Sequence, residues 1–210
     1  MKGQFFPYGD SAKTKRFPVV TVSLILTNAA IFAWSLADFE NVINTFGFTP
    51  YYFPSLYALI TIFTSMFLHA GLDHIFGNMW YLWIFGDNVE DRVGRLKFFV
   101  LYLLSGTAAS IVQYLVDTSS GIPSIGASGA VSGILGSYLV FFPKSRITTS
   151  MGYWLSESPA WFVIGFWFLM QLFFGFATLA GYSGSNIAFF AHIGGFAFGY
   201  AAAKATRKSR

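Results

Sequence analysis

Residues 98–116 read FFVLYLLSGTAASIVQYLV, a continuous stretch without a charged side chain. A helix needs about 20 mostly apolar residues to cross the hydrocarbon core of a bilayer, so this stretch is predicted to span a membrane. The composition agrees, because only 10% of the 210 residues are charged, 55% are hydrophobic and 20% are aromatic. Roughly a quarter of a soluble domain is charged. The chain therefore lacks the polar side chains that would cover a globular surface in water.

This composition excludes most soluble enzymes, nucleic-acid-binding proteins and disordered proteins. The net charge is +4, but the basic residues stand at the termini and in short clusters. They form no basic stripe with interleaved aromatics that would follow a phosphate backbone, so no nucleic-acid partner is expected. Cysteine is absent, which excludes a disulfide framework, a thiol nucleophile and a thiolate metal site.

Six apolar stretches are long enough, or nearly so, to be spans. The chain is thus predicted to be an all-α polytopic membrane protein, with residues 1–210 forming a single membrane domain. The six predicted transmembrane helices cover residues 17–37, 72–90, 97–116, 128–143, 159–180 and 187–204. The first stretch could instead be a signal peptide, since basic residues precede it and small residues end it. It is long for that role, and its cleavage would leave an odd number of spans.

Charge sets the orientation. With the N-terminus in the cytoplasm, six spans place all 13 Lys and Arg residues on the cytoplasmic side, together with both termini. Residues 51–68 are apolar enough to suggest a seventh span, but that span would move Arg92, Arg95 and Lys97 to the outside. Residues 38–71 are therefore predicted to form a long membrane-associated outer loop, which lies in the interface or partly re-enters the membrane.

Four polar residues are predicted to share one depth within the membrane. With a rise of about 1.5 Å per residue, Ser128 lies roughly 24 Å above Lys144, at the inner boundary. The same arithmetic places His74, Asn78 and His192 roughly 18 to 24 Å above the inner ends of their own helices. Ionisable residues within spans are candidates for function. The span that Ser128 begins is too short to reach the outer surface, so the loop 117–127 must dip into the membrane.

A serine at a helix N-terminus, in a wet cavity and opposite a histidine, is the arrangement of an activated nucleophile. Small residues recur at every fourth position on two spans, including Gly129 and Gly133 on one and Gly195 and Gly199 on the other. Such stripes allow close helix packing, which would bring Ser128 and His192 within hydrogen-bond range. The Ser128 backbone N–H, His74 and Asn78 could then supply the oxyanion donors.

Each of these features also has a purely structural interpretation. The sequence Gly-Ala-Ser-Gly at 126–129 and the glycine stripes could serve helix packing alone. A single histidine in a span could be a structural hydrogen-bond donor, and Asn78 could join helices. His69 is predicted to cap the re-entrant segment. Residues 90–95 are predicted to form a solvated inner loop with local ion pairs. The coincidence of the four residues at one depth favours the functional interpretation.

These residues, taken in order, resemble the rhomboid intramembrane serine proteases. The resemblance covers residues 55–200 and rests on four motifs, which are His69-x4-His74-x3-Asn78, Glu90-Asp91-Arg92-Val93-Gly94-Arg95, Gly126-Ala127-Ser128-Gly129 and Ala191-His192-Ile193-Gly194-Gly195 with Gly199. It implies the six-helix prokaryotic core, a catalytic dyad of Ser128 and His192, and oxyanion donors at His74 and Asn78. The Trp-Arg pair of many rhomboid first loops is missing. In addition, Ser132 stands where an aromatic often stacks on the catalytic histidine, which leaves open what orients His192.

The resemblance implies a protease that cleaves helix-destabilised transmembrane segments of membrane-protein substrates through an acyl-enzyme. It needs no metal or cofactor, and its partners are those substrates and the lipid bilayer. A prokaryotic cytoplasmic membrane is the expected location. One alternative is a non-catalytic rhomboid-like protein that binds membrane clients, although such proteins lose the serine or the histidine. The other is a small transporter or channel, which would place polar residues along several helices.

Access to the site is predicted from the outer side. The short span that begins at Ser128 implies a water-filled depression under the loops 38–71 and 181–187, the second of which is rich in glycine and serine. The span 159–180 is the predicted lateral gate for substrate helices. Phe173 and Phe174 are its candidate gate residues, because their bulk must move before a substrate can enter.

Overall fold

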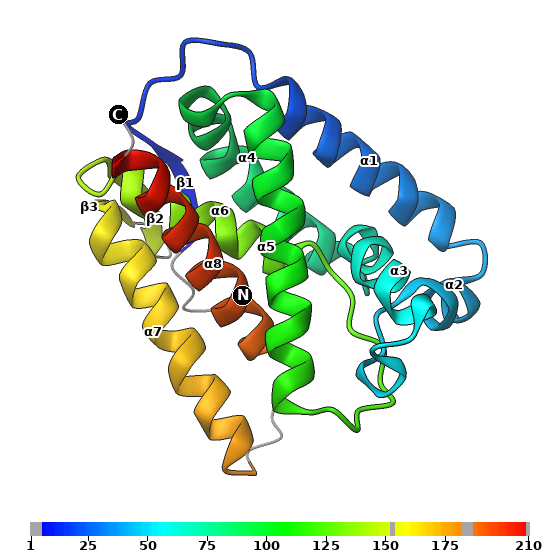
Figure 1. The fold of residues 1–210 in the computed structure, drawn as a ribbon. Coiled ribbons are helices and arrows are strands. Elements are labelled where there is room, and N and C mark those ends of the chain that lie inside the picture. The colour runs from blue at the N-terminus through cyan, green and yellow to red at the C-terminus, as the bar shows by residue number, and fades with distance from the viewer. Residues whose placement is uncertain (1–5, 152–153, 182–186, 209–210) are drawn as a thin grey trace.

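The computed structural model describes residues 6–151, 154–181 and 187–208. It is a helical bundle whose six long helices coincide with the six predicted spans (Figure 1). The helices are α1 (Val19–Ser35), α4 (Leu72–Val93), α5 (Arg95–Val116), α6 (Ser128–Phe141), α7 (Ala160–Leu179) and α8 (Phe189–Lys208). By length and composition, α5 and α7 alone among the described helices can each cross a bilayer unaided. The count of six spans therefore stays a prediction.

The long first loop is itself folded. It contains α2 (Phe39–Phe46), η1 (Pro50–Tyr52), α3 (Leu56–Thr64) and η2 (Ser65–Phe67). The segment 56–67 and α4 meet at an angle of 82°, as in a broken span or a re-entrant loop. With nine residues, α3 is about 14 Å long and too short to cross the membrane. By itself α3 is therefore no seventh span, and the membrane association of the loop stays a prediction.

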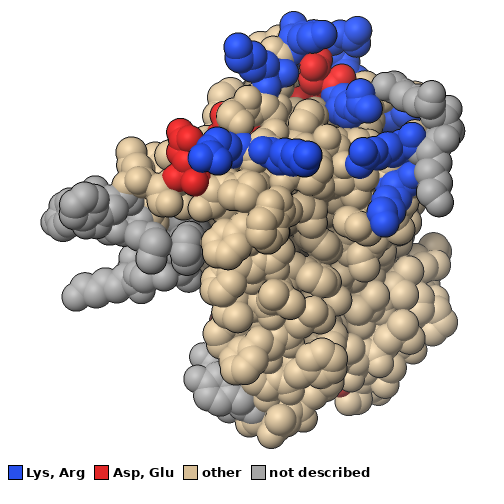
Figure 2. Space-filling view, turned by 90° about the vertical axis from the view of Figure 1, so that its left-hand side faces the viewer, with Lys and Arg blue, Asp and Glu red and all other residues tan. Residues whose placement is uncertain are grey.

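The basic side chains gather at one end of the bundle. Figure 2 shows the Lys and Arg residues near the top of the visible face, above a broad band without them. That end carries the start of α1, the turn between α4 and α5 and the end of α8 (Figure 1). The turn depends on Gly94, whose φ of 87° lies in the left-handed region that favours glycine. This distribution fits the predicted inner side.

The predicted all-α fold class is confirmed by this helical bundle, to which the described residues add one small sheet that the sequence did not predict. Strands β1 (Phe6–Asp10), β2 (Arg146–Met151) and β3 (Trp154–Pro159) form an antiparallel sheet in the order β1-β2-β3. Ile147 and Thr149 are buried and alternate with more exposed neighbours, which is the period of a half-buried strand. The sheet contacts α4 through β1 and α7 through β2 and β3. It therefore bridges two helices that are far apart in the sequence.

Side-chain hydrogen bonds fasten β1 to the bundle. The indole Nε1 of Trp80 donates to the carbonyl oxygen of Pro7 at 2.7 Å. The Asp10 carboxylate accepts from Asn88 Nδ2 at 3.0 Å and from the hydroxyl of Tyr138. Burial raises the pKa of Asp10, although both donors lower it. The N-terminal strand is thus held by α4 and α6.

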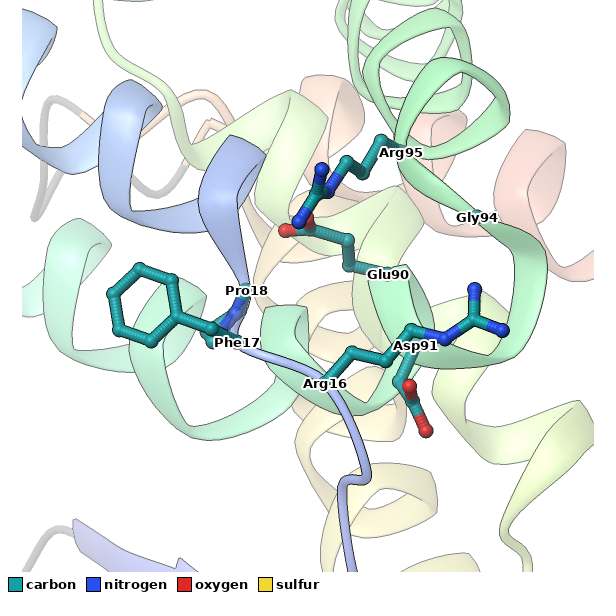
Figure 3. Close-up of a pocket in the computed structure, with 7 residues that line it drawn as sticks. All are labelled: Arg16, Phe17, Pro18, Glu90, Asp91, Gly94 and Arg95. Carbon is teal, nitrogen blue, oxygen red and sulfur yellow. The ribbon is translucent and has the colours of Figure 1, made fainter.

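The sequence predicted that Glu90 belongs to a solvated loop. In the structure Glu90 is buried instead. Glu90 is 3% exposed, and its carboxylate accepts from Val20 N at 3.0 Å, Thr21 N at 2.7 Å and Thr21 Oγ1 at 2.8 Å. In Figure 3 its side chain points from α4 toward the first turn of α1, beside a hollow of about 300 Å³. Free N–H groups at a helix N-terminus attract a carboxylate, so Glu90 caps α1 from another helix.

The core is centred on α6. Most of its side chains are buried, and its most extensive contacts are with α8. A Cβ on Gly195 would collide with the carbonyl oxygen of Gly129, and one on Gly199 with that of Gly133. The two predicted stripes of small residues therefore face each other, with backbone against backbone.

Candidate active site

Ser128 is the first residue of α6, and the loop before it is held inside the fold. The backbone N–H of Gly126 donates to the carbonyl oxygen of Ser65 at 2.9 Å. Further along the loop, Phe48 and Ser124 exchange two backbone hydrogen bonds. Loop 117–127 is thus tied to the folded first loop, which suits its predicted position at membrane depth.

The N-terminus of α6 is open. Its N-cap residue, Ala127, makes no side-chain cap hydrogen bond, so the first N–H groups are left by that residue for a ligand or a developing negative charge. Ser128 is half-buried, and Ala127 before it is fully buried. A serine hydroxyl and free backbone donors therefore occur at the same helix end.

His74 directs its Nε2 atom toward this helix end. A Cβ placed on Gly126 would lie 2.7 Å from His74 Nε2 and 3.7 Å from Ser128 Oγ. The space around Gly126 is therefore shared by the imidazole and the hydroxyl, and a larger residue would fill it. The φ of Gly126 is 123°, which also favours glycine.

The hydrogen bonding of His74 defines its tautomer. Its Nδ1 accepts from the backbone N–H of Ala70 at 3.2 Å, so the proton of the neutral ring lies on Nε2. His74 thus offers an N–H donor on the side of Ser128. His69 lies in the loop between η2 and α4, where it is fully buried, and its ring meets that of His74 edge-on at 5.0 Å. His69 supports the ring of His74.

Asn78 follows His74 by one helical turn and is 8% exposed. Its Nδ2 is buried and has no hydrogen-bond partner within the described part of the chain. Buried polar groups are nearly always paired. An unpaired buried amide donor is therefore suited to a group that arrives only during binding or catalysis.

His192 lies on α8, at the level where α8 meets the start of α6. The position one before it, Ala191, is close to Gly129, whose Cβ would lie 3.8 Å from the Ala191 carbonyl oxygen. The Nδ1 atom of His192 is 2.8 Å from Oε1 of Gln171 on α7. The ring of Trp167, one turn earlier on α7, lies 6.1 Å from the imidazole at 33°.

Two residues of this environment escaped the sequence analysis, namely Gln171 and Trp167. A signal was present, since Gln171 is a polar residue within a charge-free apolar span and polar groups at that depth are candidates for function. Ser132 has no ring that could stack on the histidine, and its Oγ donates to the carbonyl oxygen of Ser128 at 2.7 Å.

The candidate gate residues lie on the outer half of α7. Phe174 stacks on Phe189 of α8, with ring centroids 5.5 Å apart, and Phe173 is 63% exposed. Their role as a gate stays a prediction. Residues 183–185 of the predicted outer cap lie outside the described residues.

The hollow of Figure 3 is separate from this site. Glu90, which lines it, lies about 24 Å along α4 from His74.

The sequence matches a known protein family. The family described as Rhomboid domain matches residues 56–209, most of the chain. The chain belongs to the rhomboid family. The matched region contains all the motifs that carried the resemblance, from His69 to Gly199. It begins at α3 and leaves out α1 and β1.

Curated relatives of this rhomboid come from plants and vertebrates. It is 35% identical to the chloroplastic Rhomboid-like protein 11 of Arabidopsis thaliana over 60% of the chain and 44% of the relative. It is 32% identical to RHOMBOID-like protein 1 of Arabidopsis thaliana, over 66% of the chain and 32% of the relative. It is 29% identical to the mitochondrial presenilin-associated rhomboid-like protein of Mus musculus, over 59% and 33%. The chain thus spans less than half the length of these relatives.

The relatives support a membrane protein of the rhomboid family. Two of the three are named for the chloroplast or the mitochondrion, so they do not support the expectation of a prokaryotic cytoplasmic membrane.

Proposed function

We propose that this rhomboid is an intramembrane serine protease that cleaves transmembrane segments of membrane-protein substrates. The proposal rests chiefly on one observation. His74 Nε2 and Ser128 Oγ border the same space at the N-terminal end of α6. One turn from His74 lies Asn78 Nδ2, which has no hydrogen-bond partner among the described residues. A nucleophile next to several free donors is the arrangement that acyl transfer requires.

The reaction begins when Ser128 Oγ attacks the carbonyl carbon of a peptide bond and His192 Nε2 takes its proton. The Ser128 backbone N–H, His74 Nε2–H and the Asn78 amide stabilise the oxyanion. The C–N bond then breaks, and His192 returns the proton to the leaving amine. Water, deprotonated by His192, hydrolyses the acyl-enzyme, which restores the serine hydroxyl and releases the acid.

The substrate must expose a peptide carbonyl, and a regular helix hides that group. Segments that leave the helical conformation easily are therefore the expected substrates. Entry past α7 would involve Phe173 and Phe174, and substitution of either by Ala should raise cleavage of membrane substrates, because fewer contacts then hold the gate closed.

The test uses the full chain in liposomes with a single-span substrate that carries Gly and Pro near its outer end. The wild type should cleave it, and Ser128→Ala and His192→Ala should each abolish cleavage without changing insertion. The two losses should not add, since the dyad acts as a unit.

Ser132→Ala is the matched control, because it removes only the hydrogen bond from the Ser132 hydroxyl to the carbonyl oxygen of Ser128, one turn earlier. A fluorophosphonate probe should label the wild type and this control but not Ser128→Ala. Equal cleavage by Ser128→Ala would refute the proposal. A wild type that binds the substrate but neither cleaves it nor reacts with the probe would favour a non-catalytic client-binding protein.

A further inference from the structure

Any base that works beside a serine needs a group that fixes its ring. In serine hydrolases the atom opposite the reacting nitrogen usually donates its proton to a carboxylate, which sets the tautomer and the orientation of the imidazole. In this chain the corresponding atom, Nδ1 of His192, faces an amide oxygen, that of Gln171, at 2.8 Å.

The Gln171 side chain is well placed for this task. It is 9% exposed, so water competes little for its oxygen. Gln171 is one of four buried residues on α7, with Ala160, Ile164 and Gly175. Its amide oxygen can only accept a hydrogen bond, so Nδ1 of a neutral His192 must carry the proton. The lone pair is then on Nε2, the atom that must take the proton of Ser128.

Two side chains that contact the imidazole come from one helix. Trp167 and Gln171 are four residues apart and therefore lie on the same face of α7, and both meet His192. Ser132 on α6 is engaged with the Ser128 carbonyl oxygen. Within the described part of the chain, the polar and ring contacts to His192 thus come from α7 rather than from the helix that carries the serine.

We propose that Gln171 is a positioning residue that fixes the tautomer and ring orientation of His192, and that it thereby couples the position of α7 to the basicity of the catalytic group. This inference rests on the proposed protease function. An amide suits the location, because a buried carboxylate would have to be desolvated at membrane depth and an amide carries no charge.

The coupling between the position of α7 and His192 depends on how α7 packs in the bundle. Its main contacts are with α8, and only four of its residues are buried. A displacement of α7 that admits a substrate would also separate Gln171 from His192. Entry and chemistry are then successive steps, and the base is correctly oriented only after α7 has returned.

Two substitutions test the role of the amide oxygen. Gln171→Leu keeps the size but removes the acceptor, and should lower kcat by roughly 10- to 10,000-fold with little change in KM, the upper limit being that of a base in the wrong tautomer. Gln171→Glu restores an acceptor and adds a charge that favours the imidazolium. It should retain most of the activity and move the acidic limb of the kcat/KM profile to higher pH by roughly one unit or more.

Leu169→Ala is the matched control, because Leu169 lies on the same helix and is 59% exposed. It should leave kcat and the pH profile unchanged. The rate of fluorophosphonate labelling provides a second readout that needs no substrate entry, and it should fall in Gln171→Leu.

Two failures are distinguishable. If the probe does not label the wild type, the proposed protease function itself is refuted. A labelled wild type whose rate equals that of Gln171→Leu, or a Gln171→Glu profile that does not move, would refute the positioning role alone. If Gln171→Leu does not fold, the pH profile of Gln171→Glu decides by itself.

Discussion

Replacing Asn78 by leucine separates two roles that a buried asparagine can have in a membrane bundle. If Asn78 joins helices, its loss lowers stability. If it is an oxyanion donor, its amide waits unpaired in the resting protein, and its loss lowers activity alone. The Nδ2 atom is buried without a hydrogen-bond partner among the described residues, which favours the second role.

If Asn78 is an oxyanion donor, its replacement by leucine should preserve or raise the stability of the protein and lower its kcat. Leaving a buried donor unsatisfied costs about 1–3 kcal/mol, and leucine has a similar volume, so Asn78→Leu should be as stable as the wild type or more stable by up to that amount. Loss of one oxyanion donor lowers kcat by roughly 10- to 1,000-fold, with a smaller effect on KM. Thermal unfolding in detergent and steady-state cleavage in liposomes measure the two quantities.

Asn88 provides the matched control, because it lies on the same helix and its Nδ2 does donate, to Asp10 Oδ2 at 3.0 Å. Asn88→Leu should lose about 1.5–3 kcal/mol, the range for a hydrogen bond to a charged group, with kcat unchanged. Loss of stability in Asn78→Leu with unchanged kcat would refute the oxyanion assignment.

Three further predictions concern the frame around the site. Glu90→Ala leaves the N-terminal donors of α1 without their carboxylate and should lower the unfolding free energy by about 2–5 kcal/mol; a loss below about 0.5 kcal/mol in chemical denaturation would contradict the cap. Burial raises the pKa of Asp10 from 3.8, so its linked stability is present below that value and is lost as pH rises through the folded pKa. The Tm of the wild type should therefore fall relative to Asp10→Asn from about pH 4 upward, and parallel curves would contradict this. A Cβ on Gly175 would lie 3.5 Å from that of Phe189, which suits a disulfide. The pair Gly175→Cys and Phe189→Cys, oxidised, should keep probe labelling and lose cleavage of membrane substrates until reduced; cleavage by the oxidised form would show that α7 need not move.

The sequence alone determined the membrane class and the six helical stretches, and its charges predicted the orientation. These are local or additive properties, since a span depends on about 20 consecutive residues and the charge bias is a count over loops. It also determined which residues to examine, because helical rise placed Ser128, His192, His74 and Asn78 at one depth. The glycine stripes predicted that α6 and α8 meet, since only small side chains permit that approach.

The tertiary structure decided the partners. Three contacts depend on how the helices are rotated against one another. They are the capping of α1 by Glu90, the binding of Asp10 to Asn88 and Tyr138, and the contact of Gln171 with His192. Periodicity identifies the face of a helix but not the residue that another element will bring to it. The sheet was missed for the same reason, because β1 and β2 are separated by more than 130 residues and their pairing is not encoded in either strand alone.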